Sequence, residues 1–273
     1  ASLPSPQEEA RKAVQMGNMS LLYQGTVRSI LCRIHNGSMP TSVNGGYSGM
    51  FTRDSSVLLL GLMEVAAARR DDGDEAAAIH ILGKVEEVLS FMMRQLVNST
   101  FMPHIIDNPP GGANAISGNL IDESDQTAYV MMAFGTYTTL NNASEFESEH
   151  YPLMKRLLNS HVAPGAVSGP SDMYGHSTNS KITRGCCAGV PYYNETLGLI
   201  VNLNSEASRE GHYWNGYTAI TNSAMVEAMR LLSLSATRCG DHIQAAAWRA
   251  RRADVLDGIQ RSLTAKVDPA IAK

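Results

Sequence analysis

The sequence Tyr47-Ser-Gly-Met-Phe-Thr-Arg53-Asp54-Ser sets a cluster of polar and aromatic residues directly before an apolar helical run. The same order occurs twice more along the chain, and an amphipathic segment follows each apolar one within a few residues. The other two openings read Asp122-Glu-Ser-Asp125-Gln126-Thr and Glu206-Ala-Ser-Arg209-Glu210-Gly-His212-Tyr-Trp214-Asn-Gly-Tyr217. Three helical hairpins that carry polar residues at one end indicate a ring of helices around a pocket.

Apolar periodicity predicts the helices of these hairpins. The first helix of each pair is apolar nearly all round, which is typical of a buried helix, whereas the second carries one apolar stripe. The predicted pairs are Arg53–Arg69 with Asp74–Val97, Asp122–Leu140 with Ser144–Ser160, and Tyr217–Thr237 with Asp241–Leu263. In the last helix the apolar stripe comprises Ile243, Ala247, Ala250, Ala253, Leu256, Ile259 and Leu263. Two further helices are predicted over Glu8–Arg33 and Asn194–Leu203.

Strand patterns are scarce, so we expect an all-α chain. An inner ring of buried helices wrapped by an outer ring would satisfy both kinds of helix pattern. The inner helices would then run parallel, with their first turns at one mouth. We expect a single domain over residues 1–273, of which residues 1–7 form an extended, Pro- and Ser-rich tail.

Composition narrows the classes of partner. The chain has 273 residues, of which 44% are hydrophobic and 18% charged, as in an ordinary packed globule. Its net charge of −4 comes with no basic stripe, so nucleic acid is not an expected partner. No apolar run approaches the roughly 20 residues that a membrane-spanning helix needs.

Five Asn-x-Ser/Thr sequences predict N-linked glycans, and therefore a secreted or lysosomal glycoprotein; chance occurrence of the pattern is the alternative. They begin at Asn18, Asn36, Asn98, Asn142 and Asn194. The four cysteines fit an oxidising compartment as disulfides, with the pairing left open. These are Cys32, Cys186, Cys187 and Cys239. Without Cys-x-x-Cys spacing or clustered histidines, we expect neither a metal nor another cofactor.

At its three polar openings the chain resembles the six-hairpin glycosidases, the (α/α)6 barrels of glucoamylases, processing α-glucosidases and related glycoside hydrolases. The segments that carry the resemblance are Phe51-Thr-Arg-Asp-Ser, Ile121-Asp-Glu-Ser-Asp-Gln-Thr-Ala-Tyr and Gly211-His-Tyr-Trp-Asn-Gly-Tyr. The resemblance spans Gly46 to Leu263 and implies a toroid of helical hairpins that hydrolyses glycosidic bonds. A full barrel has more hairpins than this sequence predicts. The chain therefore looks like part of a barrel that is incomplete at its C-terminal end, with the remainder cleaved, disordered or supplied by a second chain.

Glycoside hydrolysis needs a protonated carboxyl group and an ionised one on either side of a sugar. The resemblance implies an aspartate acid in an acidic helix opening, for which Asp125 and then Asp122 are the candidates. Crowded carboxylates raise one another's pKa, as a proton donor requires. Glu206, and then Glu210, is the candidate base, and Arg209 would favour its ionisation. The alternative is that the acidic residues only complement a helix dipole or belong to a charged surface loop.

Residues around these carboxylates are candidates for contact with a carbohydrate substrate. Arg53 and Asp54 could bond sugar hydroxyls, or instead form an ion pair in which Asp54 caps its helix. Aromatic rings could stack on the sugar, or instead pack in the core. The full set of candidate contacts is Tyr47, Phe51, Arg53, Asp54, Glu123, Gln126, Arg209, His212, Tyr213, Trp214 and Tyr217.

Two other functions remain open at this stage. A polysaccharide lyase also uses a helical toroid, and removes a proton beside a uronate carboxylate with a tyrosine or histidine. His212, Tyr213 and Arg209 could serve that reaction. Alternatively, a non-catalytic glycan-binding or structural glycoprotein could retain the barrel without the reaction.

Overall fold

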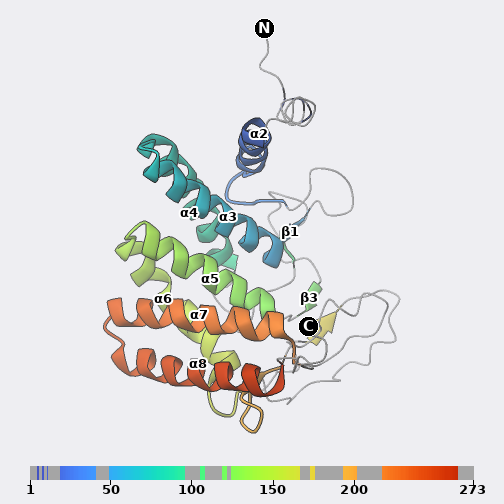
Figure 1. Cartoon of the computed structure of the whole chain (residues 1–273), viewed down its shortest axis with the longest axis vertical. Coiled ribbons are helices and arrows are strands. Elements are labelled where there is room, and N and C mark those ends of the chain that lie inside the picture. The colour runs from blue at the N-terminus through green and yellow to red at the C-terminus, as the bar shows by residue number, and fades with distance from the viewer. Residues whose placement is uncertain are drawn as a thin grey trace, which may run out of the picture. The chain divides into compact units, whose positions relative to one another are not determined.

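The structure is a computed structural model of the chain, and Figure 1 shows its arrangement of helices. It describes residues 19–40, 49–95, 105–107, 119–121, 124–166, 173–175, 193–201 and 217–263, with residues 5, 8 and 11. Over these residues the chain is mostly helical, so the all-α prediction is confirmed. It divides into two compact units, Ala1–Gln95 with Ile105–Ser117, and Leu96–His104 with Gly118–Lys273. The expectation of one domain stays a prediction.

Seven helices are present in the described residues, and each predicted hairpin corresponds to two of them. The first unit contains α2 (Met19–Leu31), α3 (Thr52–Asp71) and α4 (Glu75–Gln95). The second unit contains α5 (Ser124–Leu140), α6 (Ser144–Val162), α7 (Ala219–Arg238) and α8 (His242–Ser262). The predicted helix Glu8–Arg33 is described as a helix from Met19 onward.

Strands are limited to three short antiparallel pairs among the described residues. In the first unit, β1 (Met50–Phe51) pairs with β2 (Ile105–Asp107), directly before α3. In the second unit, β3 (Asn119–Ile121) pairs with β4 (Met173–Gly175), and β5 (Tyr193–Asn194) pairs with β6 (Leu199–Ile200).

The same three-residue turn joins the helices of all three hairpins. Its middle residue is left-handed each time, with φ of 79° at Gly73, 46° at Asn142 and 78° at Gly240. Glycine and asparagine are the residues that adopt this conformation at low cost, and they end helices this way. The third residue of each turn donates its N–H to a carbonyl five residues earlier. These bonds are Asp74 N to Arg69 O (2.8 Å), Ala143 N to Thr138 O (3.3 Å) and Asp241 N to Ala236 O (2.7 Å).

Two of the turns also start the next helix with an aspartate. The Asp74 carboxylate accepts the N–H of Ala77 at 3.2 Å, and the Asp241 carboxylate accepts the N–H of Gln244 at 3.3 Å. Such a side-chain cap satisfies one of the free N–H groups of a first helical turn. The turn sequences therefore indicate the repeated hairpin, as the apolar pattern does.

Helices α5 and α7 pack side by side and run parallel. A Cβ atom added at Gly135 would lie 2.6 Å from Cβ of Leu231, so the two backbones approach closely there. Near the carboxyl ends, Nη2 of Arg238 donates to Oγ1 of Thr138 at 3.3 Å. Because both contacts advance along the two chains in the same direction, the first turns of α5 and α7 lie at the same end. The expected parallel arrangement holds for this pair.

The first helices of the hairpins are not all buried to the same degree. Helix α5 is buried over most of its length, as expected from its apolar sequence. Helix α3 instead exposes Val57 (47%), Gly61, Glu64 and Ala68, which recur at steps of four, three and four residues and so share one face. The expectation that α3 is buried on most sides is wrong for this face.

The apolar stripe predicted for α8 is wrong. Ile243 is 87% exposed, and the alanines of that stripe are also exposed. The helix buries Ala245, Trp248, Val255 and Gly258 instead. Trp248 supplies far more apolar area than any alanine, and it therefore decides which face is turned inward.

The short helix predicted over Asn194–Leu203 is wrong as well, because this segment forms the β5–β6 hairpin. The Asn194 side chain accepts the N–H groups of Thr196 and Leu197, each at 3.0 Å, which closes an Asx turn. Gly198 follows with φ of 66°, a conformation that interrupts a helix. The hairpin packs on α8 at Gly258, where an added Cβ atom would lie 2.4 Å from the Gly198 carbonyl oxygen.

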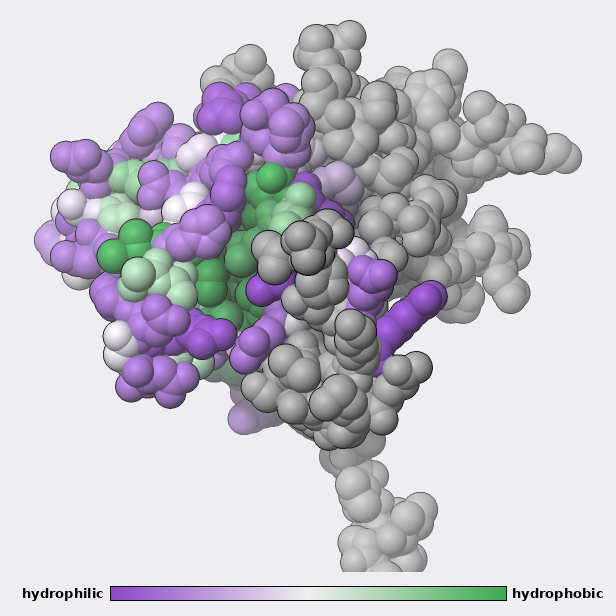
Figure 2. Space-filling view, turned by 90° about the horizontal axis from the view of Figure 1, so that it is seen from above, coloured by the Kyte–Doolittle hydropathy of each residue, from purple (hydrophilic) through white to green (hydrophobic). Residues whose placement is uncertain are grey.

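Hydrophilic residues cover most of the described surface seen from above, with apolar residues gathered in one band between them (Figure 2). Among the residues described, no helix combines the length and the apolar character that crossing a membrane requires.

Replacing Gly135 with alanine tests the close contact between α5 and α7. The added methyl group overlaps Leu231, so we expect a loss of about 1–3 kcal/mol of stability. Gly61→Ala is the matched control, because nothing lies within 4 Å of an added Cβ there and alanine favours the helix by up to about 1 kcal/mol. Thermal unfolding followed by circular dichroism should show a lower midpoint for Gly135→Ala only. Equal midpoints for the two variants would contradict the packing described.

Candidate site at the first turns of the apolar helices

Buried polar side chains gather at the starts of the three apolar helices α3, α5 and α7. They account for eight of the fourteen buried polar or charged residues in the described part of the chain. The eight are Thr52, Ser55 and Ser56 in α3, Asp125, Gln126 and Thr127 in α5, and Thr221 and Asn222 in α7. We call these segments the polar first turns. Their presence agrees with the sequence expectation that each apolar helix begins with polar residues.

The polar first turn of α5 is the one that contains a buried carboxyl group. Asp125 is 5% exposed, and Gln126 and Thr127 after it are fully buried. A carboxylate that only complements a helix dipole usually stays in water, because removing it from water costs several kcal/mol unless it is compensated. A buried aspartate with polar neighbours is therefore the strongest candidate for a chemical role among the described site residues.

The opening of α3 is held by backbone contacts. Phe51 is the N-cap residue and makes no side-chain capping bond, so Asp54 is not the cap of this helix. Oγ of Ser56 donates to the Thr52 carbonyl at 2.7 Å, and Oγ of Ser55 donates to the Met39 carbonyl at 3.2 Å. Phe51, Arg53 and Asp54 are half-buried, which leaves part of each side chain accessible.

The opening of α7 is tied to the β5–β6 hairpin. The Thr218 hydroxyl caps the helix by accepting the N–H of Thr221 at 3.2 Å. The fully buried amide of Asn222 accepts the N–H of Ile200 at 2.8 Å and donates to the Ile200 carbonyl at 3.0 Å. This pairing satisfies the backbone of a short strand edge, and the sequence reasoning missed it, since one asparagine in a helix carries no distinctive pattern.

Two predicted site residues, Tyr217 and Asn194, bond to each other. The Asn194 amide donates to the Tyr217 hydroxyl at 2.8 Å, which fixes the hairpin to the segment before α7. This contact gives both side chains a structural role. Stacking of Tyr217 on a sugar, and a glycan on Asn194, stay predictions.

The other predicted glycan acceptors within the described residues lie in exposed turns. Asn36 and Asn142 are exposed and left-handed, with φ of 51° and 46°. The conformation alone explains an asparagine at these positions, because asparagine tolerates it better than most residues. Asn18 and Asn98 lie outside the described residues. Cys32 and Cys239 carry free thiols, and Cys186 and Cys187 also lie outside the described part.

Most of the third opening cannot be compared with its prediction. The candidate residues outside the described part are Tyr47, Asp122, Glu123, Glu206, Arg209, Glu210, His212, Tyr213 and Trp214. The roles of Asp125 as acid and Glu206 as base therefore stay predictions, as do those of Asp122 and Glu210, the second candidates for each.

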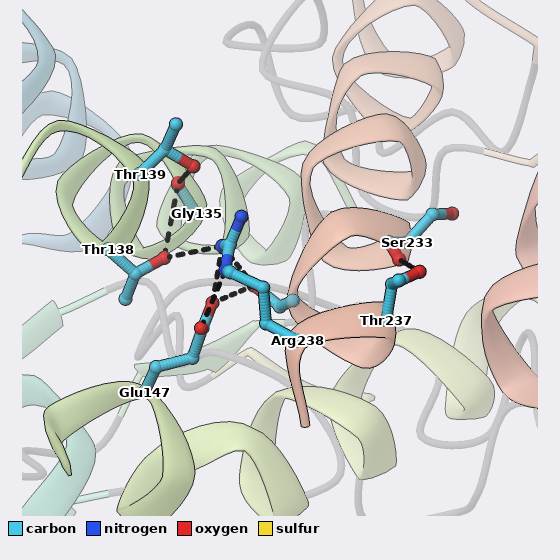
Figure 3. A network of polar contacts seen from close by, with 8 residues as sticks. Gly135, Thr138, Thr139, Glu147, Ser233, Thr237 and Arg238 are labelled. Atoms are coloured by element: carbon cyan, nitrogen blue, oxygen red, sulfur yellow. Dashed lines mark hydrogen bonds and ion pairs between the residues drawn. The ribbon is translucent and has the colours of Figure 1, made fainter. Parts of the chain in front are cut away.

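A second polar cluster, at the opposite ends of α5 and α7, was not predicted (Figure 3). Glu147 on α6 accepts from Nε of Arg238 at 2.7 Å and from the Ser235 hydroxyl at 2.6 Å, while a second bond joins it to the same guanidinium. Arg238 also reaches Thr138 on α5. The cluster therefore joins three helices through one bidentate ion pair, the strongest hydrogen-bond geometry for a carboxylate.

The pKa of Glu147 reflects two opposing effects. Burial alone would raise it, but the hydrogen bonds from Arg238 and Ser235, together with the positive charge of Arg238, hold the pKa below its ordinary value of 4.5. Glu147 lies in the first turn of α6 and Arg238 in the last turn of α7, so each charge also complements its helix dipole. The cluster acts as a structural clamp, because it ties α5, α6 and α7 together through paired charges and hydrogen bonds.

Comparison with protein-family models, with curated proteins and with solved structures found no match for this chain. In the described part of the chain, no three His, Cys, Asp or Glu side chains come together as metal ligands would.

Removing the carboxylate of Glu147 tests the clamp. In a Glu147→Gln variant the guanidinium of Arg238 loses its counter-charge, and we expect a loss of about 1–3 kcal/mol in the free energy of unfolding, reduced by the partial exposure of Arg238. Glu227→Gln is the control, because its pair with Arg230 on α7 is more exposed and is worth about 0–1 kcal/mol. Urea unfolding would contradict the clamp if both variants lost the same stability.

The clamp also predicts a pH dependence of stability. Because the folded-state pKa of Glu147 is lowered, its stabilisation is complete above pH 4.5, the ordinary value, and is lost as the pH falls through the lowered pKa. The stability difference between the parent and Glu147→Gln should therefore be constant near neutral pH and shrink below pH 4.5. A difference that stays unchanged down to the acid end of the titration would contradict this assignment.

Proposed function

We propose that the chain is a glycoside hydrolase, built as part of an (α/α) toroid, in which the polar first turn of α5 and the segment before α7 line the sugar site. The observation that carries the proposal is Asp125, a buried carboxyl in the polar first turn of an otherwise apolar helix. The neighbouring helix α7 is parallel to α5, and its opening follows directly on the segment Glu206–Tyr217 that contains the candidate base. Carboxylates distant in sequence would thereby face one pocket.

The faces of the helices support a larger ring. Helix α7 packs on α5 through Leu231, and Ala224 and Ala228 share that buried face. Counted back from the left-handed glycine of each hairpin, the equivalent positions on α3 are Val57, Gly61 and Glu64. These three are exposed, so α3 leaves uncovered the face that in α7 packs against α5. In a toroid, a further inner helix packed on this exposed face of α3 would repeat the packing of α5 on α7.

In this proposal Asp125 donates its proton to the oxygen of the leaving sugar. A carboxyl with little water around it favours its neutral form, which is the form a general acid needs. Glu206 is ionised and either activates water or attacks the anomeric carbon. Gln126 and the aromatic residues of the segment before α7, Tyr213, Trp214 and Tyr217, would orient the sugar by hydrogen bonds and stacking.

Substitution of the two carboxylates tests the proposal. Parent protein assayed against a panel of aryl glycosides and oligosaccharides should release reducing sugar, and Asp125→Asn and Glu206→Gln should each lower kcat by about 10²- to 10⁴-fold. Asp257→Asn is the matched control, because that aspartate is exposed on α8 and pairs with Arg261 at 2.7 Å. It should retain parental activity.

Three results would contradict the hydrolase. Full activity of Asp125→Asn would remove its carboxyl from the reaction. A product that absorbs in the ultraviolet would identify a lyase, which leaves an unsaturated sugar. Binding of oligosaccharides without turnover, unchanged in Asp125→Asn and Glu206→Gln, would identify a glycan-binding protein.

A further inference from the structure

A groove in the first unit lies at the opposite end of α3 from its polar first turn. It has a volume of about 410 Å³ and is bounded by α2, the last turns of α3 and the first turns of α4. Its apolar wall includes Val27 and Leu31 of α2 and Ile81 of α4. The volume falls within the range of about 300–1,000 Å³ that small-molecule pockets occupy.

The polar part of this groove carries only positive or neutral groups. Arg28 of α2, Arg69 of α3 and His80 of α4 line it, and no aspartate or glutamate among the described residues does. Asp74, which lies outside the lining, places its Oδ2 3.9 Å from Nη1 of Arg69. That distance is long for an ion pair, and the Arg69 side chain is 34% exposed, so Asp74 offsets little of the positive charge of Arg69. Two guanidinium groups therefore face one groove of a chain whose net charge is −4.

We propose that this groove binds a small amphiphilic anion, a carboxylate or phosphate ester that carries a short alkyl or aryl group. Guanidinium groups bind such anions through paired N–H donors, and His80 can add another. The apolar wall of Val27, Leu31 and Ile81 would receive the carbon chain. The required ligand chemistry follows from the two halves of the groove and is independent of the proposed hydrolase.

Cys32 gives a probe at the site itself, because its exposed free thiol lines the groove. An anionic aryl disulfide, 5,5′-dithiobis(2-nitrobenzoate), and a neutral one, 4,4′-dithiodipyridine, are compared for their rates of reaction, with each labelled cysteine resolved by peptide mass spectrometry. We expect the ratio of anionic to neutral rate to be roughly three- to tenfold higher at Cys32 than at Cys239, and to fall with added salt.

Substitutions separate the groove from general surface charge. Arg28→Gln and Arg69→Gln should each lower the rate ratio at Cys32, while Arg70→Gln should not. Arg70 is the matched control, since it is adjacent in sequence, pairs with Glu75 at 3.2 Å and does not line the groove. Circular dichroism of each variant checks that the fold is retained.

Protection of Cys32 from the neutral reagent identifies the ligand class. Octyl phosphate should protect, with about tenfold weaker affinity in Arg69→Gln. Inorganic phosphate and octanol should protect poorly, because each offers only half of the required chemistry. Phosphatidylcholine vesicles containing phosphatidylglycerol form a second arm: protection by octyl phosphate alone indicates a soluble anion, and protection by the anionic vesicles as well indicates a lipid.

Several outcomes would overturn the proposal. These are equal rate ratios at Cys32 and Cys239, no reaction of Cys32 with either reagent, an effect of Arg70→Gln equal to that of Arg69→Gln, protection by inorganic phosphate as strong as by octyl phosphate, or no protection by octyl phosphate or vesicles. None of these outcomes bears on the hydrolase, because they involve neither Asp125 nor Glu206.

Discussion

The described fold depends on one turn that is used three times. A left-handed residue, Gly73, Asn142 or Gly240, ends an apolar helix and sends the chain back along an amphipathic one. Because the return is so short, the second helix must pack against the first, and every apolar helix enters its hairpin in the same sense. Where two apolar helices meet, at Gly135 and Leu231, they are therefore parallel.

Because α5 and α7 run parallel and both begin with polar residues, their polar first turns lie at the same end of the helix pair. In α5 and α7 one group of buried polar residues lies in the first turns, and a second group lies at the other ends, where the clamp of Glu147 and Arg238 joins the helices. The two polar ends differ in kind. At the clamp a strong pairing accounts for the buried charge, and at the openings hydroxyl and amide groups bond mainly to nearby backbone. Asp125 stands apart as the buried carboxyl group of the polar first turns, which is why the proposed chemistry rests on it.

The sequence predicted the hairpins well because their signals are local. Asp-Asp-Gly-Asp before α4 and Cys-Gly-Asp before α8 combine a helix stop with a cap, and the apolar runs of α5 and α7 leave little doubt about burial. Local signals failed where tertiary contacts decide. The face of α8 follows from Trp248 and from the close approach at Gly258, and the β5–β6 hairpin depends on the Asn194 turn. Contacts such as Glu147 with Arg238, 91 residues apart, leave no trace in local spacing.

The most direct test of the central claim, that Asp125 and Glu206 face one pocket, is the distance between their carboxyl groups in a crystal structure with a bound sugar. The account predicts that both groups contact the sugar, separated by about 5–9.5 Å, the span that covers retaining and inverting hydrolases. Carboxyl groups on opposite sides of the molecule, or a sugar bound away from Asp125, would contradict it.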